Sequence, residues 1–314
     1  LFYYIMKLIS RTLVLLTAAI TLTGCLASTK YDKSTGDIRL RPVIGIGTRS
    51  GKEFIPFPED RKFNVFAISQ DTGRKFLDDV AVTYGGKRGW FPENTPKWPV
   101  DESLKFIGYY PSDLQMTCNS EGTLKMPAYT AGDIDLLVTD PTKAYNKNDS
   151  IASLPFYHAL AKIDFRAKHA LNSATRVRVE KIVIRGAYVQ GAFDSSADLR
   201  WNPAGQQTDI TVYAANGREE GIEIFNLVPK YVGSSMFIIP QKNIGSSIEV
   251  TYAFQTGESG WIGGQTVSAP VTLEAWEPDR HYTYTLSIFK DQEKELTYTT
   301  GMSSWDDTLK ENEN

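Results

Sequence analysis

The stretch His158-Ala-Leu-Ala-Lys-Ile-Asp-Phe-Arg-Ala167 decides the fold class of this chain. Its apolar side chains fall at every second position, and its charged side chains fall between them: Ala159, Ala161, Ile163 and Phe165 against Lys162, Asp164 and Arg166. Side chains alternate between the two faces of an extended chain, so this pattern predicts a strand with one dry face and one wet face. Such strands are typical of antiparallel sheets that pack one face on a core.

The same alternation recurs on both sides of this strand. It is found in Asp37–Ile44, Ile248–Phe254 and Tyr282–Ile288, while other short apolar runs are bounded by Gly, Pro and Asp. No stretch shows a sustained helical period. Short strands between turn signals favour an all-β protein built of antiparallel β-sandwiches. The length and a polar gap at 168–174 predict two domains, 37–168 and 169–314.

Composition excludes some functions. The net charge is −3 at pH 7, so no basic surface points to nucleic acid. Aromatic residues make up 12% of the chain, which favours strands. The chain has only 2 Cys, Cys25 and Cys118. Because Cys25 is predicted to be modified, no disulfide is expected, and Cys118 is read as a small buried hydrophobe rather than a reactive thiol.

The start of the chain reads as an export signal that ends at a lipidation site. Lys7 and Arg11 precede an apolar run over 12–22, which is too short to span a bilayer. The sequence Leu22-Thr-Gly-Cys25 then forms a lipobox. We predict that 1–24 is a signal peptide, that Cys25 carries lipid and that 25–36 is a tether. A plain signal peptide with a chance Cys is the alternative.

Signals for chemistry are missing. The three histidines, His158, His169 and His281, do not stand at metal-ligand spacing, and no phosphate loop, nucleophile elbow or zinc-protease motif occurs. The sequence therefore predicts no catalytic residue, no metal and no cofactor. Four tryptophans lie in or near predicted loops, where they would either stack on sugars or anchor the loops: Trp90, Trp98, Trp201 and Trp261.

Several motifs occur together in one order along the chain. After the lipobox come Thr48-Arg49, Leu104–Pro111, the strand 157–165, Phe237–Gln241, Trp276–Leu286 and Trp305-Asp306. In this order and spacing the chain resembles the fimbrillin family of Bacteroidetes surface lipoproteins, the type V pilins. The resemblance covers nearly all of 25–305, and the His-Ala-Leu-Ala-Lys strand is its best single mark.

The resemblance implies two tandem transthyretin-like domains and assembly by strand exchange. In that family a trypsin-like protease cuts after Arg or Lys in the first loop, and the emptied groove takes a strand from a neighbouring subunit. Here the removable strand would be Asp37–Ile44, with Ile38 and Leu40 in the core. Arg49 is the preferred cleavage site, with Arg39, Arg41 and Lys52 as rivals, although an uncut Arg49 in a solvated loop is equally consistent. The C-terminal segment from Trp305 onward is the candidate donor.

Two functional hypotheses follow. The first is a fimbrial structural subunit, exported as a lipoprotein to the surface of the outer membrane, whose partners are other fimbrial subunits. The second is an uncleaved surface adhesin, or a pilus tip or anchor, that binds host protein or glycan. An enzyme is disfavoured because no pair of catalytic carboxylates stands out.

Overall fold

A computed structural model describes residues 36–46, 53–149, 151–169, 175–197, 200–217, 220–225, 228–288 and 296–305. Over these ranges the chain forms strands β1 to β24 and one short 3-10 helix, η1 (Gly86–Arg88), with no α-helix. The all-β prediction is therefore confirmed. No helix among the described residues is long and apolar enough to cross a membrane.

The strands have the following bounds: β1 Leu40–Ile46, β2 Glu53–Pro56, β3 Phe63–Ser69, β4 Lys75–Tyr84, β5 Trp90–Pro92, β6 Leu104–Tyr110, β7 Thr117–Cys118, β8 Leu124–Thr130, β9 Leu137–Thr139, β10 Ala152–His158, β11 Ala161–His169, β12 Thr175–Ala187, β13 Gln190–Asp194, β14 Trp201–Ala204, β15 Thr208–Ala214, β16 Ile222–Ile224, β17 Lys230–Tyr231, β18 Met236–Ile238, β19 Gln241–Lys242, β20 Ser247–Thr256, β21 Ile262–Pro270, β22 Ala275–Trp276, β23 Arg280–Ile288 and β24 Leu296–Ser304.

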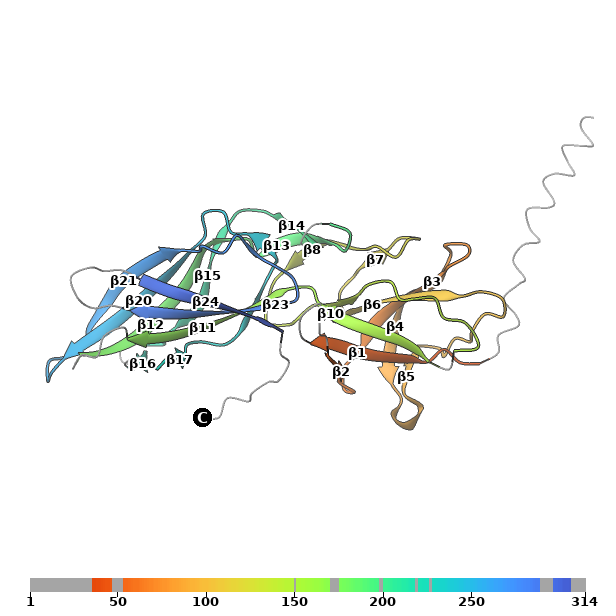
Figure 1. Ribbon diagram of the computed structural model, residues 1–314, viewed down its shortest axis with the longest axis horizontal. Helices are drawn as coiled ribbons and strands as arrows, with labels where there is room; N and C mark the ends of the chain where they lie inside the picture. Colours follow the sequence, from red (N-terminus) through yellow and green to blue (C-terminus); the bar gives the residue numbers. More distant parts are fainter. Residues whose placement is uncertain are drawn as a thin grey trace, which may run out of the picture.

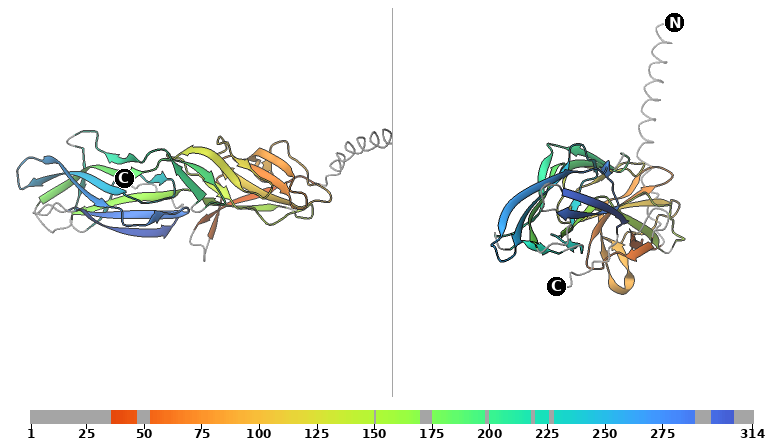
Figure 2. Two further views of the ribbon diagram at one scale, coloured as in Figure 1. Left: turned by 90° about the horizontal axis from the view of Figure 1, so that it is seen from above. Right: turned by 60° about the vertical axis from the view of Figure 1, so that its left-hand side comes forward.

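The molecule is elongated, with two lobes arranged end to end (Figure 1). The first lobe contains one eight-stranded sheet in the order β10-β9-β6-β3-β4-β5-β1-β2, and an additional pairing of β1 with β10 closes this sheet on itself. The second lobe contains two sheets, one built on β17-β11-β23-β24 and the other on β15-β12-β20-β21. The view from above in Figure 2 shows the same end-to-end arrangement.

Each lobe has its own apolar core. The two sheets of the second lobe enclose one core, to which β23 contributes Tyr282, Tyr284, Leu286 and Ile288 at every second position. This regular alternation is what the sequence predicts for a sandwich strand. The core of the first lobe is rich in aromatic side chains. A third core lies where the lobes meet and takes residues from both halves of the chain.

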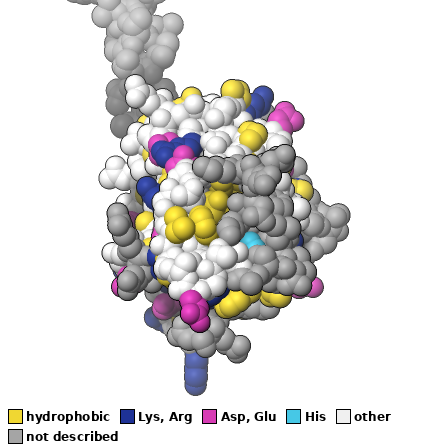
Figure 3. Space-filling view, turned by 90° about the vertical axis from the view of Figure 1, so that its left-hand side faces the viewer, with side chains coloured by type: hydrophobic (Ala, Val, Ile, Leu, Met, Phe, Trp, Pro, Cys, Tyr) yellow, Lys and Arg dark blue, Asp and Glu magenta, His cyan; other side chains and the backbone are white. Residues whose placement is uncertain are grey.

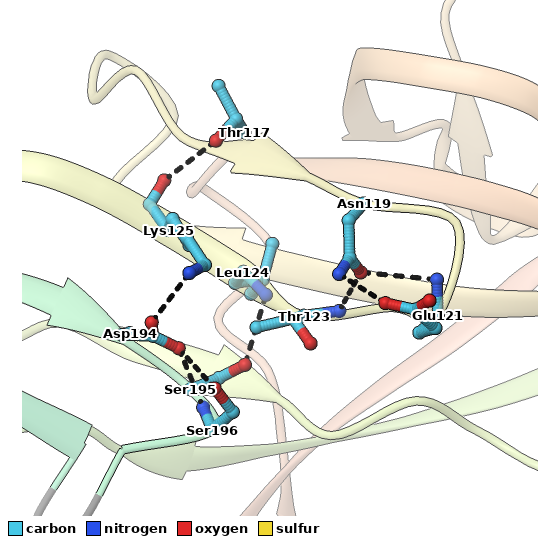
Figure 4. Close-up of polar contacts among 9 residues, drawn as sticks. All are labelled: Thr117, Asn119, Glu121, Thr123, Leu124, Lys125, Asp194, Ser195 and Ser196. Atoms are coloured by element: carbon cyan, nitrogen blue, oxygen red, sulfur yellow. Dashed lines mark hydrogen bonds and ion pairs between the residues drawn. The ribbon is translucent and has the colours of Figure 1, made fainter.

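A small sheet joins the two halves of the chain, in the order β14-β13-β8-β7. At the end of the ladder between β8 and β13, Ser195 and Leu124 exchange hydrogen bonds: the Ser195 amide donates to the Leu124 carbonyl, and the Leu124 amide donates to Ser195 Oγ (Figure 4). Lys125 Nζ lies 2.8 Å from Asp194 Oδ2 in the same place. The halves are therefore connected by main-chain ladders as well as by side-chain packing.

Among the described strands, two ladders are parallel and the others are antiparallel. β1 runs parallel to β10, and β11 runs parallel to β23. β11, which the sequence predicts at the end of the first domain, pairs with β17, β18 and β23 of the second lobe. The division of the chain at 168 stays a proposal, and the pairing of β11 argues for a division before Ala161.

Candidate functional site

β1 fills the seam of the closed sheet, and its side chains alternate between core and solvent. Ile38 is 0% exposed and Leu40 3% exposed, and Ile44 is also buried. Arg39 and Arg41, which lie between the apolar residues, are exposed. The ladder begins at Leu40 rather than at Asp37, because Asp37 forms only an isolated bridge with Lys97.

Main-chain hydrogen bonds hold β1 along both sides. Leu40 to Ile44 are in register with Ala152 to Phe156 of β10, and Val43 to Ile46 pair with β2. Ahead of the strand, the Ile38 amide donates to the Pro96 carbonyl at 2.8 Å and the Trp98 amide donates to the Gly36 carbonyl at 2.7 Å. The segment from Gly36 onward is thus fixed to its own lobe before the ladder begins.

Beneath β1 lies a floor of aromatic rings. Phe57 makes edge contacts with Phe63 at 5.2 Å and Trp90 at 5.5 Å between ring centroids, and a tilted contact with Phe156 at 5.2 Å. Leu40 pairs directly with Trp90, and Ile44 pairs with Phe156. Burial of each aliphatic side chain of β1 is worth roughly 1.5–3 kcal/mol. Removal of β1 would uncover this floor together with the ladder groups of β10, and we call that space the β1 groove.

Near the end of β1, Gly45 lies close to two aromatic rings, those of Tyr157 and Phe54. A Cβ atom added to Gly45 would lie 2.9 Å from Tyr157 Cε1 and 3.3 Å from Phe54 Cε1. Any larger residue at 45 would have to displace the Tyr157 ring. A strand that occupies the β1 groove in this register therefore needs a glycine at that point, which the sequence alone did not reveal.

Several predicted site residues lie outside the described residues. Cys25 and Arg49 both do, as does Lys52. Arg49 belongs to the connection 47–52 between Ile46, the last residue of β1, and Glu53, the first of β2. The rivals Arg39 and Arg41 have exposed side chains, but their backbone takes part in the pairing of β1 with β10, which extends to the Arg39 carbonyl.

The C-terminal end of the fold is fixed in the junction between the lobes. β24 pairs along its whole length with β23, from Leu296 with Ile288 to Ser304 with Arg280. Trp305 follows it and is buried. Its ring stacks on His158 with centroids 3.9 Å apart and on Phe237 at 5.5 Å. The predicted donor segment therefore begins with a residue that is packed into its own subunit, and 306–314 lie outside the described residues.

Two of the three histidines pair with aspartates. His158 Nδ1 lies 2.5 Å from Asp135 Oδ2, and His281 Nε2 lies 2.7 Å from Asp164 Oδ2. Burial acts to raise the pKa of Asp164, but hydrogen bonds from His281 and Ser235 outweigh it and hold that pKa below its usual value. Across the described ranges, no group of three or more His, Cys, Asp or Glu side chains is placed to hold a metal ion.

Cys118 is buried and free of any disulfide, as the sequence predicted. Burial raises the pKa of its thiol to about 11. At neutral pH the thiol is protonated and is a poor nucleophile. Of the 6 tryptophans, Trp90, Trp98, Trp201, Trp276 and Trp305 are buried, and Trp261 alone is partly exposed.

Comparisons with known proteins agree with this architecture. A family model for fimbrillin-like proteins matches residues 48–305. A fimbrial protein from Bacteroides vulgatus shares the fold with a TM-score of 0.63 at 16% identity, covering 78% of this chain and 93% of that one. A protein from Bacteroides ovatus assigned to cell adhesion gives a TM-score of 0.56 at 13% identity, with 87% and 99% covered. A comparison with curated proteins gives no match.

The family model begins after β1, covers β2 to β24 and the junction core, and ends at Trp305. Membership of this family supports a place at the cell surface and the prediction that the chain is not an enzyme. The sandwich fold agrees with the match over 48–305, and the chain belongs to the fimbrillin-like family.

Proposed function

We propose that this chain is a fimbrial subunit that polymerises by strand exchange at the β1 groove. Export would end with lipid on Cys25 and attachment to the outer membrane. A protease would then cut after Arg49, and β1 would leave with its lipid. A strand from a second subunit would take its place.

The observation that carries the proposal is the way β1 is held. It is the first strand of the fold, it is bound by ladders to β10 and β2, and it is connected onward only through 47–52. A cut in that connection leaves no covalent bond between β1 and the lobe it completes. The vacated lobe would expose unpaired main-chain groups beside an open aromatic core, and a strand from another chain would satisfy both.

The test compares Arg49→Gln with the unchanged protein in cells that carry the surface protease. We expect N-terminal sequencing of the surface protein to begin at Ser50, and we expect heat-resistant ladders on a gel. Arg49→Gln should keep Cys25 as its N-terminus and remain monomeric. The matched control is Arg88→Gln, because Arg88 is an exposed arginine in η1 outside β1 and its connection to β2. Ladders formed by Arg49→Gln with an intact N-terminus would contradict the proposal.

One observation supports a second candidate function, an uncleaved tip or anchor subunit that binds a partner through its surface. Trp305 stacks on His158 and on Phe237, so the end of β24 is fixed in its own junction. Release of a donor strand that includes β24 would give up that packing and the ladder with β23. A surface protein that begins at Cys25 in every preparation would favour this second function.

A further inference from the structure

We infer that the outer face of the β12–β20–β21 sheet carries a binding site for a neutral sugar residue of a glycan, centred on Trp261. The inference rests on the adhesion part of the function and not on strand exchange. It starts from the fact that Trp261 is the only tryptophan of the chain left partly exposed. Its neighbours Gly260 and Ile262 are exposed as well.

Two guanidinium groups support the indole ring of Trp261. The Cζ atom of Arg178 lies 4.6 Å from the ring centroid, and that of Arg176 lies 5.2 Å from it. Residues two apart on a strand share a face, so both groups approach the ring from β12. The residue paired with Arg178 on β20 is Ala253, whose small side chain is fully buried. Because the Ala253 side chain is small, the indole ring of Trp261 can lie close to the surface of the sheet.

Hydrogen-bonding groups surround the ring and are already held in place. Arg176 makes a two-pronged contact with Glu223, at 2.6 and 2.8 Å, and donates to Gln255 Oε1 at 3.0 Å. Glu180 accepts from the Gly264 amide at 3.1 Å and contacts Arg178 at 3.4 Å. Arg178 Nε is buried and lacks a hydrogen-bond partner among the described residues. Polar groups fixed in this way lose little freedom when a ligand binds.

The charges of this face select the kind of ligand. Arg176 pairs with Glu223 and Arg178 with Glu180, so the four charges nearest the ring form two pairs of opposite sign. A flat ring beside planar amide, carboxylate and guanidinium groups is suited to a sugar, whose C–H face packs on the ring while its hydroxyls bond to the polar groups. Because these charges are already paired, a neutral ligand fits this face better than a charged one.

The location suits adhesion. The turn between β20 and β21, which precedes Trp261, lies at the left-hand end of Figure 1, whereas the described chain begins at the opposite end, before β1. Figure 3 views the molecule from that left-hand end, where hydrophobic side chains are open to the surface. A subunit attached through its N-terminal end would hold this turn at the end of the molecule away from the attachment.

To test this, the monomeric protein that begins at Cys25 is titrated with lactose, mannotriose and chitotriose. Binding is measured by tryptophan fluorescence and by calorimetry. At least one neutral sugar should bind, and Trp261→Ala should weaken that binding at least tenfold while the thermal unfolding midpoint stays unchanged. Gln255→Ala should weaken it by a smaller factor. Sialyllactose, the acidic counterpart of lactose, should bind no more tightly than lactose.

The matched control is Tyr231→Ala, because Tyr231 is also an exposed aromatic residue beneath a guanidinium, that of Arg166 at 4.2 Å, but on the other sheet. The Tyr231→Ala variant should bind the sugar as tightly as the unchanged protein does. The inference is overturned if no neutral sugar binds at 20 mM, if Trp261→Ala binds as well as the unchanged protein, or if only sialyllactose binds. Since the monomer is used, none of these results bears on cleavage at Arg49 or on polymerisation.

Discussion

At the scale of single residues, the contact between Lys125 and Asp194 links the two halves of the chain. The hydrogen bond from Lys125 is the largest cause that lowers the pKa of Asp194, followed by hydrogen bonds from Ser196, and together they bring it to about 2. An ordinary aspartate has a pKa of about 3.9. The folded state therefore favours the charged form, and this contribution to stability is complete above about pH 4.

Asp194→Asn should lower the free energy of unfolding at pH 7 by about 1 kcal/mol, since the lysine side of the pair is exposed to water. The difference from the unchanged protein should shrink as the pH falls from about 4 to about 2, because the native carboxylate is protonated over that range. Urea unfolding of both proteins at a series of pH values measures this difference in the free energy of unfolding. Asp133→Asn, a change at an exposed position, is the control, and a difference that stays constant down to pH 2 would refute the assignment.

At the scale of elements, the sequence predicted strands best where one face is dry. β11, β23 and β1 all show the expected alternation, because each covers a core on one side only. Partners were harder to predict than strands. The parallel ladder of β1 with β10 joins segments about a hundred residues apart, and alternation does not show which strand lies beside which.

The last strand shows a related limit. The ladder with β23 carries β24 past Gly301 to Ser304, although glycine weakens strands. The role of Trp305 could not be read from the sequence either, because its stacking partners His158 and Phe237 come from distant elements. In the candidate site, the burial of Ile38 and Leu40 agrees with their alternation, whereas the need for glycine at Gly45 depends on Tyr157 across the ladder.

Trp305→Ala should destabilise the protein by about 3–5 kcal/mol, because the change removes a buried ring from the junction core. It should also speed hydrogen exchange along β24 more than along β12. Chemical unfolding and amide exchange followed by mass spectrometry measure the two effects. Met302→Ala, at a side chain that is 59% exposed on the same strand, should change stability by less than about 0.5 kcal/mol. Equal effects of the two changes would show that Trp305 does not fix the strand.

At the scale of the whole molecule, the two lobes share more than a linker. The sheet of β7, β8, β13 and β14 takes strands from both halves, and the junction core does the same. Unfolding of one lobe would therefore break ladders and packing that belong to the other. Contacts of this kind couple domains that would otherwise unfold separately.

We expect one cooperative thermal transition for the described fold, with the same midpoint by far-ultraviolet circular dichroism and by tryptophan fluorescence. Fluorescence reports on both lobes and the junction, since buried tryptophans lie in all three cores. Asp194→Asn should shift the midpoints measured by circular dichroism and by fluorescence by the same amount. Two midpoints separated by more than a few degrees would show that the lobes unfold independently.

The parallel course of β1 and β10 has a mechanical consequence. Figure 1 shows both strands along the long axis, and the chain passes from β10 through Ala159 and Leu160 into β11, which continues along that axis beside β23. Tension in a fibre of such molecules would load the strand in the β1 groove in shear, so that its hydrogen bonds would resist together rather than open one after another. Force entering at one end would reach the other end through a nearly straight backbone.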